Sequence, residues 1–211
     1  MIPSREEWYN TLSERHGREL CDRFAAATVA ICGLGGLGSN IAISLARAGV
    51  GKLILIDFDR VDISNLHRQQ YKADQIGIYK TEALSGSLKE IAPYIELDAR
   101  AVRITEDNAA ELLSEADVVC EAFDRAEQKA MLTNTVLTDM PDKYLVAGSG
   151  VAGLSTANAI RTRRITGKFY LCGDEVSDVE NARFLISSRV MLCAAHQAHA
   201  VLRILAGRYD V

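Results

Sequence analysis

The chain has 211 residues, of which 48% are hydrophobic, and this is enough to form the core of one domain. Its 24 Lys and Arg residues against 28 Asp and Glu residues give a net charge of -4, without the cationic excess expected of a protein whose main partner is nucleic acid. Five scattered cysteines with no C-x-x-C pair disfavour a disulfide framework. With no signal core or membrane-spanning apolar run, we expect a reduced, soluble, cytoplasmic protein without a membrane or nucleic-acid partner.

Strands and helices are expected to alternate along most of the chain. Short apolar runs bounded by glycine or acidic residues predict parallel strands covered on both faces, and apolar side chains at helical spacing predict helices. The expected strands are 28–32, 52–59, 95–102, 117–123 and 143–150, and the expected helices are 4–26 (one or two), 39–50, 81–91 and 126–137. Ser39 is expected to begin the helix at 39–50, and Gly49 is expected to end it.

Crossovers of helical length between the strands predict a doubly wound, mostly parallel α/β sheet. Residues 156–172 break the alternation and predict a hairpin, and residues 188–207 predict a closing helix. We therefore expect one domain over 1–211. It would comprise an N-terminal helical segment (1–27), a core (28–150), and a hairpin with the closing helix (151–211).

A glycine-rich turn joins the first expected strand to the next helix. It has the pattern G-x-G-x-x-G, formed by Gly33, Gly35, Gly36 and Gly38. Such glycines let the backbone approach a phosphate at a helix N-terminus, and Asp57 follows at the spacing of about twenty residues typical of a ribose ligand. This combination predicts a nucleotide site. The alternative is a turn that only allows tight packing between strand and helix.

Polar and cationic residues follow the second expected strand, on the side of the sheet where open α/β folds bind ligands. They are Asp57, Asp59, Asn65, Arg68 and Gln69, with Lys80 further along the chain. A dinucleotide needs one acid for its ribose, but Arg68 and Lys80 suit the β and γ groups of a triphosphate. The residue types therefore favour ATP over NAD.

Asp124, in the segment "EAFDR" after the fourth expected strand, is the candidate for holding a divalent cation that accompanies ATP. The alternative is that Asp124 caps the helix that follows, which is a common role of aspartate.

Several segments together resemble the ThiF/MoeB superfamily of ubiquitin-activating-like adenylyltransferases, and most closely its short ThiF type associated with thiamine biosynthesis. They are "ICGLGGLGSNIAISLARAGVGKLILIDFDRVDISNLHRQQY", Lys80, "EAFDR" and "AAHQA". The resemblance covers about residues 13–207. It implies a Rossmann-like adenylyltransferase domain that transfers AMP from Mg-ATP to the C-terminal glycine carboxylate of a small ubiquitin-like, ThiS-like sulfur carrier, with release of pyrophosphate.

The resemblance also implies roles for individual residues. Asp57 resembles the ribose ligand, Asn65, Arg68 and Lys80 resemble the phosphate ligands, and Asp124 resembles the magnesium-linked acid. Family members are usually homodimers in which an N-terminal arginine reaches the partner's nucleotide. Arg15 is the best match here, although the usual R-Y-x-R-Q sequence is absent and a solvated surface role is the alternative.

The sequence departs from the family in its cysteines. Many relatives bind zinc through two C-x-x-C pairs, and without them we expect no structural zinc. Cys172 is the better placed cysteine for a reactive role, whereas Cys32, Cys120 and Cys193 are expected in the core. His196 and His199, three residues apart on the closing helix, are expected to pack or to form hydrogen bonds.

Three other functions remain open from the sequence. An NAD-dependent oxidoreductase would use the turn and Asp57 but has no need of Arg68 and Lys80. An adenylating enzyme that acts on a tRNA-borne carboxylate would need a basic surface. A noncatalytic scaffold subunit would be expected to lack the phosphate ligands, which are present here.

Overall fold

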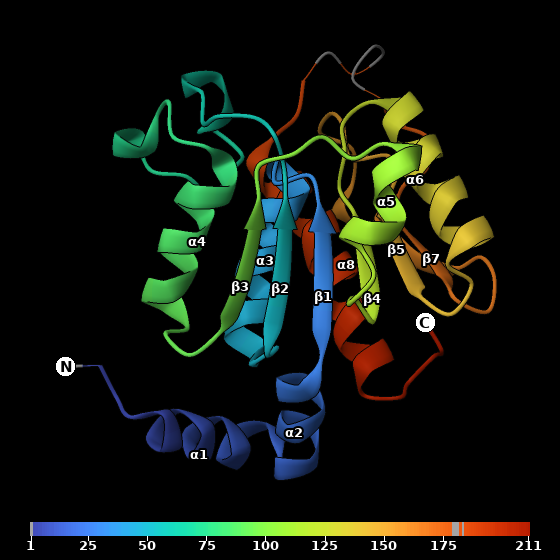
Figure 1. The fold of residues 1–211 in the computed structure, drawn as a ribbon. Coiled ribbons are helices and arrows are strands. Elements are labelled where there is room, and N and C mark those ends of the chain that lie inside the picture. The colour runs from blue at the N-terminus through green and yellow to red at the C-terminus, as the bar shows by residue number, and fades with distance from the viewer. Residues whose placement is uncertain (1, 179–181, 183) are drawn as a thin grey trace.

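The computed structural model describes residues 2–178, 182 and 184–211 (Figure 1). The described strands are β1 (Thr28–Cys32), β2 (Lys52–Ile56), β3 (Glu96–Arg100), β4 (Val118–Glu121), β5 (Tyr144–Gly148), β6 (Arg161–Arg164) and β7 (Phe169–Gly173). They form one sheet in the order β3-β2-β1-β4-β5-β7-β6. Every neighbouring pair is parallel except β6 and β7, which form the predicted hairpin. The predicted doubly wound α/β fold is confirmed.

Helices cover both faces of this sheet. They are α1 (Arg5–His16), α2 (Arg18–Ala26), α3 (Gly36–Ala48), α4 (Lys80–Ile91), α5 (Glu106–Leu112), α6 (Ala126–Asp139) and α8 (Ser187–Leu205). One hydrophobic cluster joins the sheet to α3, α4 and α8, and a second joins it to α5 and α6 (Figure 1). In the described ranges, no helix is both long and apolar enough to cross a membrane.

Helix α3 begins earlier than its sequence predicts. Its first residue is Gly36, so the expectation that Ser39 begins the helix is wrong. The Ser39 hydroxyl lies inside the helix and donates to the Gly35 carbonyl at 2.7 Å. The turn is so tight that the second half of the glycine motif already forms the first helical turn. The other end is as predicted, because Gly49 ends the helix in the left-handed conformation with φ of 90°.

Helix α5 was not predicted. It has only seven residues, too few for a helical period to stand out, and Thr105 begins it with a capping box in which Asn108 takes part. Three 3-10 turns, η1 (Ile63–Asn65), η2 (Ala73–Gln75) and η3 (Ala157–Ala159), were also not foreseen. The first of them shapes the loop between β2 and α4.

Candidate active site

The predicted ligands gather at the carboxyl ends of the central strands. Strand β1 lies between β2 and β4, so the strand order reverses there, which is where open α/β sheets bind ligands. The glycine turn follows β1, the loop of residues 57–79 follows β2, and Asp124 comes shortly after β4. Figure 1 shows these three connections at the same end of the sheet, opposite α1 and α2.

Three of the four glycines in the turn are required by packing. Gly33 has φ of 90°, and a Cβ there would lie 2.9 Å from the Ala122 carbonyl oxygen. A Cβ on Gly36 would lie 2.8 Å from Cγ1 of Val190, and one on Gly38 would lie 1.8 Å from the Gly33 carbonyl oxygen. Packing therefore accounts for these three glycines, as the alternative interpretation of the motif expected.

Gly35 is different, because its own packing does not require glycine. The nearest atom to a Cβ there is Nε2 of Gln69, at an ordinary contact distance of 3.7 Å. The Gln69 side chain is buried, and its Oε1 has no hydrogen-bond partner among the described residues. Buried amide groups are normally satisfied, so this position offers both room and a free polar atom to a bound ligand.

Asp57 ties the second strand to the glycine turn. Its Oδ2 accepts a hydrogen bond from the Leu34 amide at 2.6 Å, and its Oδ1 accepts one from the Asp59 amide at 2.8 Å. Burial raises the pKa of Asp57, and the charge of Lys80 opposes this rise. The carboxylate is thus fixed beside the turn, in the position expected of a ribose ligand.

Lys80 lies at the first position of α4 and is buried. Its Nζ lies 2.9 Å from Oδ2 of Asp59 and 3.9 Å from Oδ2 of Asp57. Lys80 is therefore paired with acids in this structure, and a phosphate would have to compete with Asp59 for it. The predicted contacts of Lys80 and Asp59 with nucleotide stay predictions.

Side chains of the β2–α4 loop hold it against the start of α3. The buried Tyr71 donates its hydroxyl to the Leu34 carbonyl at 2.7 Å. The backbone amide of Gln70 donates to the Ser39 hydroxyl at 3.1 Å, and its side-chain Nε2 donates to Oδ1 of Asn40 at 2.7 Å. These contacts fix the position of the polar residues just before them. No separate sequence signal indicated the role of Tyr71.

Arg68 lies beside the first turn of α3, half-buried, with its side chain 3.6 Å from the Cβ position of Gly36. Its Nη1 donates to the Ser64 carbonyl at 3.2 Å, and within the described ranges it has no salt bridge. Burial lowers the pKa of Arg68, and the charge of Asp124 opposes this change. The carbonyl of Asn65 supports the loop here by accepting from the amides of Arg68 and Gln69. Arg68 is a desolvated cation available to an anion.

Asp124 is exposed and has no hydrogen bond among the described residues. The N-cap of α6 is Arg125, and no side chain caps this helix, so the interpretation of Asp124 as a helix cap is wrong. A free carboxylate near Arg68 fits the coordination of Mg²⁺, which keeps several waters and usually takes only one or two protein carboxylates besides the phosphates.

A buried polar network that the sequence did not predict lies at the end of β4, three residues before Asp124. Glu121, the last residue of β4, pairs with Lys129 of α6 at 2.9 Å and accepts from the Phe123 amide at 2.8 Å. Lys129 also donates to the Gly148 carbonyl at 2.7 Å, and Gln197 of α8 donates to the Glu121 carbonyl at 3.0 Å. Burial raises the pKa of Glu121, which Lys129 opposes. This network holds the turn that carries Asp124.

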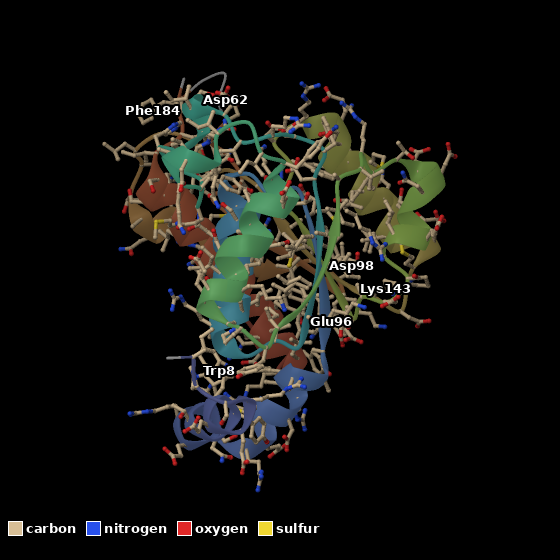
Figure 2. The ribbon with its side chains drawn as sticks, turned by 60° about the vertical axis from the view of Figure 1, so that its left-hand side comes forward. Trp8, Asp62, Glu96, Asp98, Lys143 and Phe184 are labelled. Atoms are coloured by element: carbon tan, nitrogen blue, oxygen red, sulfur yellow. The ribbon has the colours of Figure 1, made fainter. Side chains whose placement is uncertain are left out.

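A second buried ion pair anchors the loops that follow β5 and β7. Arg189 at the start of α8 pairs with Asp174 and donates to the carbonyls of Ser155 and Thr156 at 2.8 and 3.0 Å. Figure 2 places Phe184, just before α8, at the same end of the molecule as Asp62, with Trp8 of α1 at the other end. These loops therefore border the same end of the sheet as the predicted ligands.

The cysteines do not support a reactive thiol at the site. Cys172 is fully buried on β7, and burial raises its pKa to about 11, which contradicts its choice as the better placed reactive cysteine. Cys32, Cys120 and Cys193 are buried as predicted. In the part of the chain that the structure describes, no group of three or more His, Cys, Asp or Glu side chains could hold a metal ion.

Arg15 lies on α1, at the end of the sheet opposite the glycine turn (Figure 1). Its side chain is exposed, and it cannot act on a nucleotide bound at the turn of its own chain. The prediction that Arg15 serves the nucleotide site of another copy therefore stays a prediction, as does its alternative, a solvated surface role.

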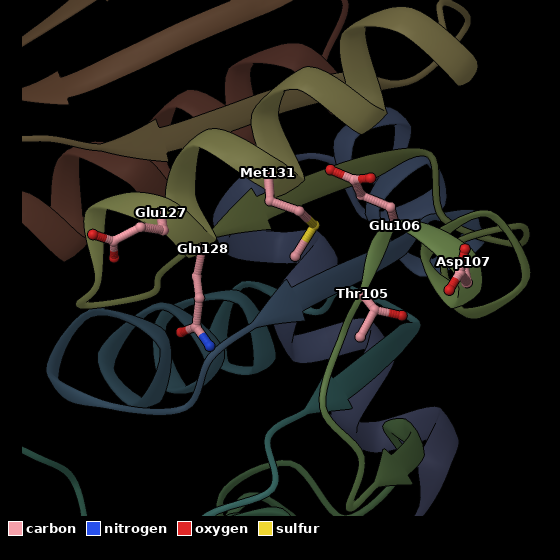
Figure 3. A pocket seen from close by; sticks show the side chains of 6 residues that line it. All are labelled: Thr105, Glu106, Asp107, Glu127, Gln128 and Met131. Carbon is pink, nitrogen blue, oxygen red and sulfur yellow. The ribbon is translucent and has the colours of Figure 1, made fainter.

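A separate hollow of about 370 Å³ lies between the start of α5 and α6. Figure 3 shows its lining side chains, which include Glu106, Asp107 and Glu127. Three carboxylates without a lining cation would repel a triphosphate. None of the predicted nucleotide ligands lines this hollow.

The model of the ThiF family matches residues 9–211 of the chain. Among curated proteins, the chain is 27% identical over 194 residues to the adenylyltransferase and sulfurtransferase UBA4 of Lodderomyces elongisporus, covering 89% of this chain and 42% of the relative. It is 34% identical over 136 residues to the sulfur carrier protein adenylyltransferase of Thermus thermophilus, covering 64% of this chain and 45% of the relative. The chain thus spans less than half the length of these curated relatives.

Among solved structures, the fold is similar to that of E. coli tRNA N6-threonylcarbamoyladenosine dehydratase, TcdA, crystallised in complex with AMP. The TM-score is 0.86 at 21% sequence identity, and the match covers 99% of this chain and 98% of that chain. At this identity the likeness concerns the fold alone, and it agrees with the predicted Rossmann-like architecture.

Proposed function

The chain belongs to the ThiF family, as the resemblance of its motifs predicted, and on this premise we propose that it is an ATP-dependent adenylyltransferase. A carboxylate oxygen of the acceptor attacks the α-phosphorus of ATP, the bond from that phosphorus to the bridging oxygen breaks, and pyrophosphate leaves. The products are an acyl-adenylate and pyrophosphate. This step needs no covalent nucleophile from the protein, so positioning and electrostatics carry the catalysis.

Each residue of the candidate site has a part in this proposal. Asp57 binds the ribose, and Gly35 leaves space for the phosphates beside the N-terminus of α3, whose free amides favour an anion. Arg68, with Asn65 and Lys80, binds the β and γ phosphates. Asp124 would hold Mg²⁺, which supplies positive charge to the phosphates when it is bound.

The observation that carries the proposal is the position of Arg68 beside the glycine turn, with neither a salt bridge in the described ranges nor full exposure to water. NAD has no β and γ phosphates of a triphosphate to neutralise, so a half-buried arginine at this place suits ATP better than NAD. The same cation argues against a noncatalytic scaffold subunit, which has no need to retain it.

We take the acceptor to be the C-terminal glycine carboxylate of a small ubiquitin-like sulfur carrier. The name of the Thermus thermophilus relative supports this choice. The test is pyrophosphate exchange into ATP with purified protein, Mg²⁺ and a carrier that ends in Gly-Gly. Exchange should depend on the intact tail, and a carrier that lacks the last glycine is the control. Exchange that ignores the tail would exclude this acceptor, and binding of NAD without ATP would exclude the whole proposal.

A tRNA-borne carboxylate is the second candidate acceptor. It is supported by the likeness in fold to TcdA, whose name describes an enzyme of a modified adenosine in tRNA; the likeness covers 99% of this chain and 98% of that chain. A tRNA that bears a carboxylate-modified adenosine should then support ATP consumption that the carrier does not. The two acceptors are tested side by side with the same protein preparation.

We expect a homodimer in which Arg15 reaches the partner's site. Arg15→Ala and Asp124→Ala variants should each retain about a hundredth of the wild-type rate or less, and mixing them should restore about a quarter of that rate, because half of the random dimers carry one intact site. Exchange rates of the mixture provide the measurement. An unaltered rate in Arg15→Ala alone would show that the arginine is only a surface charge.

A further inference from the structure

A cavity of about 520 Å³ lies between the hairpin β6–β7, helix α8 and the residues after α8. Its volume falls in the range of about 300 to 1,000 Å³ that is typical of sites for small organic ligands. No residue of the glycine turn and no predicted nucleotide ligand lines it. It is therefore separate from the candidate active site.

The charges that line this cavity are mostly positive. Arg161, Arg203 and Arg208 line it together with His196 and His199. The one lining carboxylate side chain belongs to Asp210, which is already paired with Arg203 at 2.6 Å. Within the described ranges, the guanidinium groups of Arg161 and Arg208 have neither a hydrogen bond nor an ion pair. A protein with a net charge of -4 thus places two unpaired arginines at one hollow.

Besides Thr162 and the exposed Val211, the rest of the lining is apolar and buried. Ile160, Tyr170 and Ala200 are 3%, 2% and 5% exposed and form part of the wall. His196 contacts the Thr162 hydroxyl through Nδ1 at 2.9 Å, which orients its ring and leaves Nε2 as the free nitrogen. A cavity with cations at one part and a rigid apolar wall at another suits a ligand that has both an anionic and an apolar part.

We infer that this cavity binds a small organic phosphate, with Arg161 and Arg208 holding the phosphate group and Ile160 and Tyr170 contacting the apolar part. Guanidinium groups bind phosphate oxygens through two parallel hydrogen bonds, which makes arginine suited to this role. His196 and His199, expected to pack or to form hydrogen bonds, line the same cavity as these arginines and would face the bound ligand.

Phenyl phosphate is the probe that tests the inference, in a calorimetric titration of the full chain at low salt. We expect wild-type protein to bind it more tightly than inorganic phosphate, because the ring covers the apolar wall, and not to bind benzyl alcohol. The double variant Arg161→Ala/Arg208→Ala should weaken binding by at least about tenfold. Both side chains are exposed, so the variant should keep the wild-type fold.

Two further variants identify the site of binding. Arg163→Ala removes an equal charge from the same strand, but Arg163 pairs with Glu175 and does not line the cavity, so binding should be unchanged. Arg68→Ala should also leave it unchanged, which separates this cavity from the nucleotide site. Absence of binding to wild type, unchanged binding in the double variant, or loss in Arg68→Ala instead would each overturn the inference.

Discussion

Two pairs of charged residues lie near the carboxyl end of β4, and they differ in how their charges are satisfied. Glu121 and Lys129 form a buried ion pair with further backbone partners. Arg68 and Asp124 interact electrostatically but, in the described ranges, form no ion pair. We call Glu121 and Lys129 the closed pair, and Arg68 and Asp124 the open pair. The closed pair supports the turn that carries Asp124. Charged side chains without an ion pair near the carboxyl end of a strand are the ones available to a ligand.

In the glycine turn, too, one glycine serves packing and a neighbouring one leaves space for a ligand. Gly38→Ala should lower the free energy of unfolding by more than about 4 kcal/mol, because its Cβ would lie 1.8 Å from the Gly33 carbonyl oxygen. Gly35→Ala should change stability by less than about 1 kcal/mol but weaken ATP binding, because the methyl group fills ligand space. Urea unfolding and ATP titration measure the two effects. Equal stability of the two variants would contradict this assignment.

The closed pair should contribute to stability rather than to chemistry. Glu121→Gln keeps an acceptor for the Phe123 amide but leaves Lys129 without its counter-charge. The free energy of unfolding should therefore fall by about 3 kcal/mol. This value is at the low end for a buried pair because Lys129 is partly exposed. Urea midpoints provide the measurement. Adding Lys129→Met should restore part of the loss. Activity per folded molecule should stay within about twofold of wild type.

The open pair should show the reverse pattern. Arg68→Ala and Asp124→Ala should each reduce kcat/KM for adenylation by about 100-fold, which corresponds to about 2.7 kcal/mol of transition-state stabilisation. Their unfolding midpoints should stay close to wild type, because neither side chain has an ion pair to lose in the described ranges. Loss of stability without loss of rate in either variant would reverse the roles assigned to the two pairs.

The smallest effect is expected for a paired acid at the edge of the sheet. The Arg100 guanidinium lowers the pKa of Asp98, so this pair stabilises the fold above the unfolded-state pKa of about 3.9 and the contribution is lost as pH falls through the folded-state pKa. Asp98, labelled in Figure 2, is partly exposed. Asp98→Asn should therefore cost less than about 1 kcal/mol at pH 7. The difference from wild type should disappear in strong acid, as measured by urea unfolding at several pH values.

Much of the fold could be predicted from local patterns. Apolar runs such as residues 28–32 and 52–59 are continuous because both faces of the sheet are covered, and the structure confirms both as strands, although the second ends at Ile56. The predicted start of α3 is wrong because serine is a common helix cap, which favours Ser39 as the first position. The tight packing of Gly38 against Gly33 instead places the start of the helix inside the glycine motif.

The residues of the candidate site could be predicted only where their spacing along the chain indicates their place. Asp57 and Arg68 could be predicted because they follow a glycine turn and the end of a strand, and both features are visible in the sequence. The Glu121 network was missed because Gln197 reaches Glu121 from a distant helix, and no local pattern records such a contact. A glutamate that ends an apolar run, with a lysine eight residues later in the next predicted helix, is the one signal that could have indicated it. The burial of Cys172 likewise depends on packing between β7 and α8.

Helix α8 packs against α3, and its Val190 fills the space beside Gly36. One of the last elements of the chain thus covers one of the first, and β1 pairs with β4 some ninety residues later. Contacts between residues so distant in sequence slow folding, and those between α3 and α8 cannot form on the ribosome until α8 has been made. Until then, the apolar face of α3 stays uncovered, so synthesis that stops before α8 yields a chain prone to aggregation.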